Sequence, residues 1–200
     1  MPSPTSDHGS LRDISVRVLA DDWYVLRKAS FERRGRDGIW RRQEREAYDR
    51  GNGAAILLHD PVRRTVLLTR QFRWPAYANG HPDGMLLEVC AGLLDADDPE
   101  SAIRREAKEE TGVEVDGLRA LFTAYMSPGS VTERLHFFYA TYSPEQRLAP
   151  GGGVAAEGEE LEVLELPVAE ALRMVAAGEI LDAKTIMLLT WLKDGGVAQG

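Results

Sequence analysis

The N-terminal quarter of the chain shows apolar and polar residues in alternation, interrupted by turn-forming residues. Such alternation is typical of strands with one buried face. We expect residues 1–10, which are rich in Pro, Ser and Asp, to form a disordered start. The pattern that follows predicts an antiparallel sheet with strands at Ile14–Leu19, Trp23–Glu32 and Trp40–Tyr48.

Beyond this quarter, short apolar runs mix with segments of helical period. The apolar runs predict strands at Gly53–Leu58, Thr65–Gln71, Met85–Cys90, Leu118–Tyr125, Leu135–Tyr142 and Leu161–Leu166. Two helices are expected near the C-terminus, from Pro167 to Ala177 and from Asp182 to Leu192, because a stop glycine follows the first and Asp182 caps the second. The mixture indicates an α/β protein with a mixed sheet.

A third helix is predicted from Pro99 to Thr111. Asp98 is a good N-cap residue, Pro99 fits the first helical position and Gly112 supplies a left-handed stop. On this helix Glu106, Glu109 and Glu110 are three and four positions apart, so their carboxylates lie along one side. The helix therefore concentrates negative charge on one face.

Two interpretations of this acidic face are open. Like charges at this spacing repel by about 0.2–0.5 kcal/mol a pair, which a bound divalent cation would offset, and carboxylate oxygens are ligands that Mg²⁺ and Mn²⁺ prefer. The alternative is a solvated helix face, since such runs are common on surfaces. The first interpretation predicts a metal site and a phosphate-handling reaction.

Composition narrows the class of protein. At 200 residues, 44% hydrophobic and 28% charged, the chain has enough material for one sizeable core. A net charge of −8 argues against nucleic acid as the main partner. Cys90 is the only cysteine, which excludes an internal disulfide. Because no apolar stretch suggests a signal peptide or a membrane span, we expect no membrane partner and a cytoplasmic location.

The acidic helix carries the string RREAKEETGV, which resembles the signature of the Nudix hydrolases. One departure stands out: the loop before the helix is one residue shorter than in the family signature, so its acidic position falls on Asp97 and its glycine position on Ala91 instead of Gly92. The resemblance implies the Nudix fold, an α/β/α sandwich with a mixed sheet, and catalysis that depends on Mg²⁺, with Mn²⁺ as a possible substitute.

Further strings extend the resemblance over nearly the whole chain to the GDP-mannose hydrolases, close relatives of the ADP-ribose pyrophosphatases. They include YDRGNGAAILL, RQFR, EVCAGLLD, YMSPGSVTE and GEILDAKT. This resemblance implies hydrolysis of GDP-mannose to GMP and mannose 1-phosphate, with ADP-ribose as the alternative substrate. It also implies a dimerisation sheet at 11–50, a catalytic domain at 51–200, and a homodimer in which the sheet completes the partner's site.

The resemblance also assigns candidate site residues. Glu106, Glu110 and the carbonyl of Ala91 would ligate metal, with Glu109 supporting them and Arg105 orienting a glutamate. A loop carboxylate would serve as a further ligand or as the general base; the register of the next strand selects Glu159, and counting from the preceding glycines selects Glu157. The implied substrate contacts are Trp23, which would stack on the base, and Arg45, Glu46, Arg50, Arg73, Gly92, Leu93, Glu133 and Lys184.

Two other functions are weaker on the same residues. An isopentenyl-diphosphate isomerase of this fold needs an active-site cysteine, and Cys90 lies in an apolar strand. A non-catalytic nucleotide sensor usually lacks carboxylates that this helix retains. Arg104 is expected to be a solvated helix residue.

Overall fold

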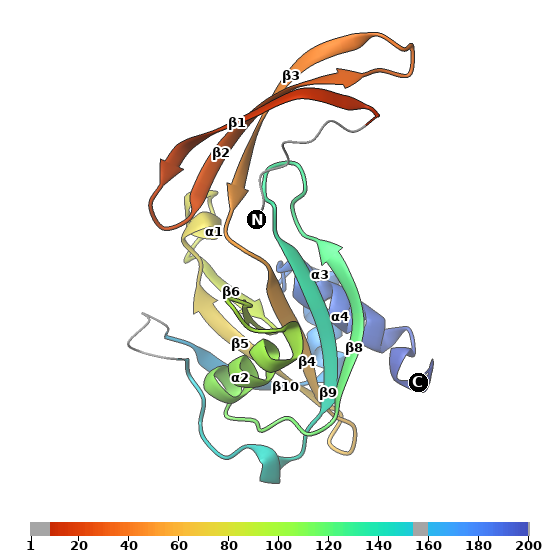
Figure 1. Cartoon of the computed structure of the whole chain (residues 1–200). Helices are drawn as coiled ribbons and strands as arrows, with labels where there is room; N and C mark the ends of the chain where they lie inside the picture. The colour runs from red at the N-terminus through yellow and green to blue at the C-terminus, as the bar shows by residue number, and fades with distance from the viewer. Residues whose placement is uncertain (1–8, 154–159, 200) are drawn as a thin grey trace. The chain divides into compact units, whose positions relative to one another are not determined.

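The computed structural model describes residues 9–153 and 160–199 (Figure 1). The chain forms two compact units. One contains the chain up to Asn52 together with Tyr125–Arg134, and the other contains Gly53–Ala124 and the chain from Leu135 onward. No helix in the described part is long and apolar enough to cross a membrane.

The first unit is built on a three-stranded antiparallel sheet, as the alternating pattern predicts. Its strands are β1 (Leu11–Asp21), β2 (Val25–Arg34) and β3 (Trp40–Asp49), with β2 in the middle. The segment 125–134 docks on the end of β3, where the Tyr48 amide donates to the Ser130 carbonyl at 2.8 Å. None of the described side chains of this unit is buried.

The second unit contains a seven-stranded mixed sheet in which β4 and β9 run parallel, whereas β5 is antiparallel to β4, β6 and β10, and β7 is antiparallel to β4. The order is β10-β5-β4-β9-β8, with β6 beside β5 and β7 beside β4. The strands are β4 (Gly53–Asp60), β5 (Thr65–Phe72), β6 (Met85–Glu88), β7 (Cys90–Leu93), β8 (Leu118–Tyr125), β9 (Arg134–Thr141) and β10 (Glu162–Pro167).

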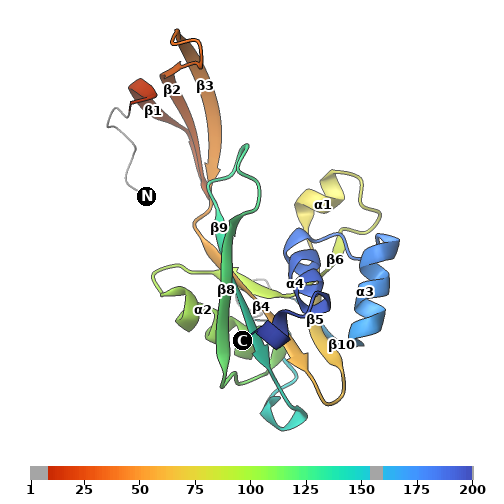
Figure 2. The ribbon, with the colours of Figure 1, turned by 90° about the vertical axis from the view of Figure 1, so that its right-hand side faces the viewer.

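Helices cover both faces of this sheet, which gives the α/β/α sandwich that the sequence predicts. Figure 2 shows α2 (Pro99–Thr111) on one side and α3 (Val168–Ala177) and α4 (Ala183–Lys193) on the other. Shorter helical pieces are α1 (Trp74–Ala78), η1 (Pro144–Gln146) and η3 (Gly196–Gln199).

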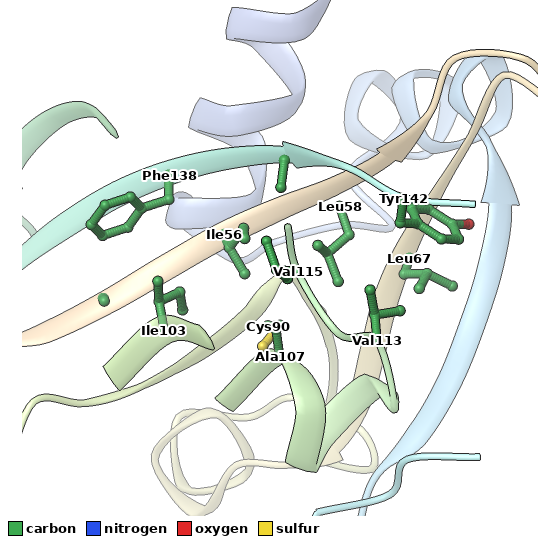
Figure 3. Close-up of a cluster of buried hydrophobic side chains, with 12 residues drawn as sticks. Ile56, Leu58, Leu67, Cys90, Ile103, Ala107, Val113, Val115, Phe138 and Tyr142 are labelled. Atoms are coloured by element: carbon green, nitrogen blue, oxygen red, sulfur yellow. The ribbon is translucent and has the colours of Figure 1, made fainter. Parts of the chain in front are cut away.

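The core holds α2 against the sheet. Alternate residues of β4, Ile56 and Leu58 among them, pack on one side against Ile103 and Ala107 of α2 (Figure 3). All four are fully buried. At roughly 25 cal/mol per Å² of apolar surface, burial of each large side chain contributes about 1.5–3 kcal/mol. This packing fixes the helix that carries the carboxylates.

The structure departs from the sequence prediction between residues 85 and 93. The single expected strand is two strands, because β6 pairs with β5 whereas β7 pairs with β4. At the break, the Val89 amide donates to Thr185 Oγ1 of α4 at 2.8 Å instead of to a neighbouring strand. The sequence prediction also omits α1, a five-residue helix with no buried residue.

Candidate active site

Helix α2 begins and ends where its capping residues predict. The Asp98 carboxylate accepts from the amides of Glu100 at 3.0 Å and Ser101 at 3.1 Å, and Gly112 adopts the left-handed conformation with φ 75°. These contacts satisfy backbone groups that a helix leaves unpaired at its ends. The helix therefore holds its side chains at the spacing on which the metal-site prediction depends.

Glu106 and Glu110 are buried in the face that α2 turns toward β7. Their exposed fractions are 8% and 2%, which is unlike a solvated helix face. The Ala91 amide donates to Glu110 Oε2 at 3.3 Å. A Cβ at Gly92 would overlap the Glu106 carboxylate, so this strand approaches the two carboxylates as closely as a glycine allows. Leu93, the remaining candidate here, lies partly buried in β7 opposite Gly53.

Arg105 lies over the outer edge of the carboxylates. Its Nη1 is 2.9 Å from Glu106 Oε1 and 3.3 Å from Glu109 Oε2, and its Nε is 3.6 Å from Asp97. Burial lowers the pKa of Arg105, but the charges of Glu106 and Glu109 outweigh it and raise the pKa. Arg105 thus contacts two of the predicted catalytic glutamates.

Arg104 is partly solvated, with its side chain 36% exposed, but it also makes contacts that the sequence does not predict. Its Nη1 donates to the carbonyl of Val115 and, at 3.2 Å, to that of Asp116, and its Nη2 donates to Glu100 at 3.2 Å. The guanidinium therefore fastens α2 to the segment that follows it.

The oxygen atoms near the carboxylates of α2 decide whether this site suits a divalent cation. Among the described residues, no group of three or more His, Cys, Asp or Glu side chains is arranged to hold a metal ion. The two buried carboxylates and the adjoining backbone of Ala91 offer oxygen donors, which suit a hard cation. Their chemistry fits such an ion as part of a larger donor set.

The expected loop carboxylates, Glu157 and Glu159, lie outside the described residues. Both ends of the intervening segment are described. The amides of Gly152 and Gly153 donate to the carbonyls of Glu110 at 2.9 Å and Glu109 at 3.3 Å. The Leu161 amide donates to the Gly152 carbonyl at 3.1 Å. Gly152 and Gly153 are therefore attached to the C-terminal end of α2, and Leu161 is attached to Gly152.

A second cluster of charges surrounds Glu88, at the end of β6. Arg73 donates to both oxygens of this carboxylate, Nε at 2.7 Å and Nη2 at 2.9 Å. Lys184, on α4, donates to Glu88 Oε2 and, at 2.9 Å, to Asp182. Glu88 is 1% exposed. The structure thus brings together two predicted substrate-binding cations, Arg73 and Lys184, through a carboxylate that sequence reasoning missed.

The ionisation of this cluster follows from its contacts. Burial raises the pKa of Glu88, but the hydrogen bonds from Arg73 and the charge of Lys184 outweigh it and lower the pKa to about 2. Burial lowers the pKa of Arg73, and the contacts with Glu88 more than reverse that effect. Glu88 and Arg73 are therefore both charged at neutral pH. The signal available in the sequence was one acidic residue inside the apolar run MLLEVC.

The remaining candidates lie in the first unit. Trp23 is 81% exposed just before β2, and Arg45 and Glu46 are on β3. Arg50 pairs with Glu133 at 3.5 Å, and its guanidinium lies 5.7 Å from the ring centroid of Tyr24. The first contact joins the residue after β3 to the 125–134 segment, and the second joins it to the residue before β2.

Comparison of the sequence with known protein families and proteins identifies the class of protein to which this fold and site belong. The NUDIX domain family matches residues 49–189, and the chain belongs to the Nudix family. Nudix hydrolases generally use a divalent metal. Residues 10–48 match the family described as "GDP-mannose pyrophosphatase NudK N-terminal domain".

Several relatives carry one name, "GDP-mannose pyrophosphatase". The protein of that name from Klebsiella pneumoniae is 52% identical over 187 residues, which cover 94% of this chain and 93% of the relative. The one from Salmonella paratyphi B is 53% identical over 180 residues, covering 90% and 93%. The one from Yersinia enterocolitica is 52% identical over 187 residues, covering 94% and 97%.

Proposed function

We propose that this protein hydrolyses the diphosphate of a nucleotide sugar with the help of Mg²⁺, and that its substrate is GDP-mannose. The observation that carries the proposal is the buried pair Glu106 and Glu110, held against the Ala91-Gly92 backbone on the helix that bears the family signature. The names of relatives about 52% identical over most of the chain favour GDP-mannose over ADP-ribose.

Glu106, Glu110 and the Ala91 carbonyl would hold the cation in this proposal, with Glu159 as a further ligand or the general base. A bound divalent cation supplies neutralisation of the diphosphate and activation of the attacking water. Arg105 keeps the Glu106 carboxylate in place through its contact at 2.9 Å, and Glu109 supports Arg105 through a contact at 3.3 Å. Mn²⁺ has the same preference for oxygen ligands and is expected to substitute.

Arg73 binds the diphosphate, because a guanidinium presents donors in a fork that matches phosphate oxygens. Its side chain is 40% exposed while Glu88 fixes its orientation from the buried side. Lys184 adds a second positive charge. Water attacks one phosphorus atom, the bond from that phosphorus to the bridging oxygen breaks, and the proton of the water passes to the loop carboxylate. The products are GMP and mannose 1-phosphate.

The unit built on residues 11–50 is proposed to be a dimerisation element. Its sheet has no buried side chain among the described residues, and a three-stranded sheet needs packing against another surface for stability. The candidates for substrate contact carried by this unit are Trp23, which would stack on the base, together with Arg45, Glu46, Arg50 and Glu133. In the proposed homodimer the sheet would help to complete the partner's site.

A substrate panel tests the function. Phosphate release, measured after coupled phosphatase treatment, is compared for GDP-mannose, ADP-ribose, GDP-glucose and a dinucleoside polyphosphate, each with Mg²⁺ and with chelator. We expect fastest turnover of GDP-mannose and its loss with chelator. Preference for ADP-ribose would move the protein to the neighbouring branch with the same chemistry, and no turnover of any compound would favour the sensor function instead.

A substitution tests the metal site itself. Glu110→Gln removes one ligand charge and also relieves repulsion on α2, so we expect kcat to fall by at least a hundredfold while the fold is retained. The matched control is Glu100→Gln, the same change on the first turn of the same helix, where the side chain is 57% exposed. Near-normal activity of Glu110→Gln in the panel assay would overturn the metal-site assignment.

A further inference from the structure

A cavity of about 770 Å³ lies at the end of β5, next to Arg73. It falls in the size range of about 300–1,000 Å³ that small-molecule sites occupy. The cavity lies wholly within the second unit. Its lining residues are Arg70, Gln71, Phe72, Arg73, Met85, Glu160, Leu161 and Glu162. Apart from Arg73, none of these side chains has a role in the reaction proposed above.

Phe72 presents an aromatic surface in this cavity. The side chain is 51% exposed, yet it is held in place. The centroid of its ring is 6.0 Å from that of Tyr77, and a Cβ at Gly84 would lie 2.7 Å from Phe72 Cε2, so the backbone of Gly84 packs directly against the ring. A rigid ring that remains half exposed is suited to receive the apolar face of a ligand.

The other lining side chains are polar and weakly engaged. Arg70 is 3.4 Å from Asp83 and 3.8 Å from Glu162, and all three side chains are about half exposed. Ion pairs with that exposure contribute little to stability, so Arg70 and Glu162 can exchange their contacts for contacts with a ligand. The two lining carboxylates, Glu160 and Glu162, repel phosphate but accept hydrogen bonds from hydroxyl groups. Arg70 and Gln71 can donate hydrogen bonds to hydroxyl oxygens.

We propose that this cavity receives the hexose of the nucleotide sugar, with one face of the sugar ring against Phe72 and its hydroxyls facing Arg70 and Glu162. A pyranose has C–H groups on its faces and hydroxyls around its edge, which matches one aromatic ring surrounded by polar groups. Arg73 lies in the same cavity and would bind the phosphate attached to that hexose. The inference rests on the proposed function, because it divides that substrate between two subsites.

Binding of the two products tests this assignment without requiring turnover. Isothermal calorimetry measures mannose 1-phosphate and GMP separately, each with Mg²⁺, on the full-length protein. We expect Phe72→Ala to weaken mannose 1-phosphate about fivefold to tenfold and to leave GMP within twofold, since an aromatic contact has that magnitude. In turnover of GDP-mannose, KM should rise by a similar factor with little change in kcat.

Trp74→Ala is the matched control. Trp74 is also exposed, at 65%, follows Arg73 directly and has its ring centroid 5.9 Å from that of Tyr77, but it does not line the cavity. It should bind both products as the wild type does. If Phe72→Ala fails to fold, judged by circular dichroism, Phe72→Leu keeps apolar volume without the ring and should weaken mannose 1-phosphate in the same direction.

Three results would overturn the inference. In the first, Phe72→Ala weakens binding of GMP and leaves that of mannose 1-phosphate unchanged, which would place the nucleotide here. In the second, Phe72→Ala binds each product as tightly as the wild type does, and in the third the wild type does not bind mannose 1-phosphate. Failure of the proposed function is seen separately. It would appear as absence of nucleotide-sugar turnover by the wild type, whatever the calorimetry of the variants shows.

Discussion

At the scale of single residues, Glu88 holds the side chains of Arg73 and Lys184 in position. The carboxylate is buried and accepts hydrogen bonds from both cations. Its negative charge offsets the repulsion between the two positive charges. Removing one partner of a buried ion pair costs about 3–5 kcal/mol, because the remaining charge is left uncompensated. The cluster is also fixed by Asp182, which accepts from Lys184 and from Thr185.

We therefore expect Glu88→Gln to lower the free energy of unfolding at pH 7 by about 3 kcal/mol, measured by urea denaturation. The control is Glu170→Gln, whose carboxylate pairs with Arg173 on an exposed helix surface and should change stability far less. Activity should fall more than stability explains, as a higher KM, because Arg73 loses its orienting partner. An unfolding curve like that of the wild type would contradict a stabilising role for Glu88.

Glu88 also makes the free energy of unfolding depend on pH in the acidic range. Its pKa is about 2 in the folded protein against 4.5 for an ordinary glutamate, so its contribution is complete above pH 4.5 and is lost as the pH falls toward 2. That shift corresponds to about 3 kcal/mol. Wild type and Glu88→Gln should therefore converge in unfolding free energy between pH 4.5 and 2. A constant difference across that window would show that folding does not lower the pKa of this carboxyl.

At the scale of elements, the sequence predicts those helices and strands whose ends and pattern are determined by residues nearby in the chain. Helix α2 was predicted with its actual bounds, because Asp98, Pro99 and Gly112 determine its ends locally. The three strands of the first sheet were also predicted, with ends that shift by up to three residues. Their alternation is a local property as well.

Elements determined by distant partners could not be predicted in this way. The break between β6 and β7 depends on Thr185, which is 96 positions away in sequence from Val89. The role of Glu88 depends equally on Lys184. In the candidate site, the spacing of Glu106 and Glu110 revealed their common side, whereas their burial beneath β7 became visible only with the packing of Gly92.

The glycine run after η1 gives an element-scale prediction. Gly151 has φ 75°, and a Cβ there would overlap the Glu110 carbonyl at the end of α2. Gly151→Ala should therefore displace the 151–153 segment from the helix, lower kcat by at least tenfold and reduce stability by about 1–2 kcal/mol. Gly117→Ala is the control, since a Cβ at Gly117 has no neighbour within 4 Å. Equal kcat for both variants would show that the anchored segment has no part in catalysis.

At the scale of the whole molecule, the two units differ in how they are stabilised. The second unit has a buried core from β4, β9 and α2, whereas the described part of the first unit has none. Its exposed side chains include Val18 at 54%, Trp23 at 81% and Ile39 at 56%. A small sheet with such a surface is marginal in isolation. Association with a second copy would bury that surface.

We expect light scattering at micromolar concentration to give twice the chain mass of 22.2 kDa. The melting temperature should rise with protein concentration, because association stabilises the folded state by mass action. Val18→Asp places a charge at an exposed apolar position of β1 and should shift the protein toward monomer with reduced activity. Val62→Asp makes the same change at a site 89% exposed in the second unit and should remain a dimer. A fully active wild-type monomer would mean that the first unit is stable without a partner and that its candidate substrate residues act, if at all, within one chain.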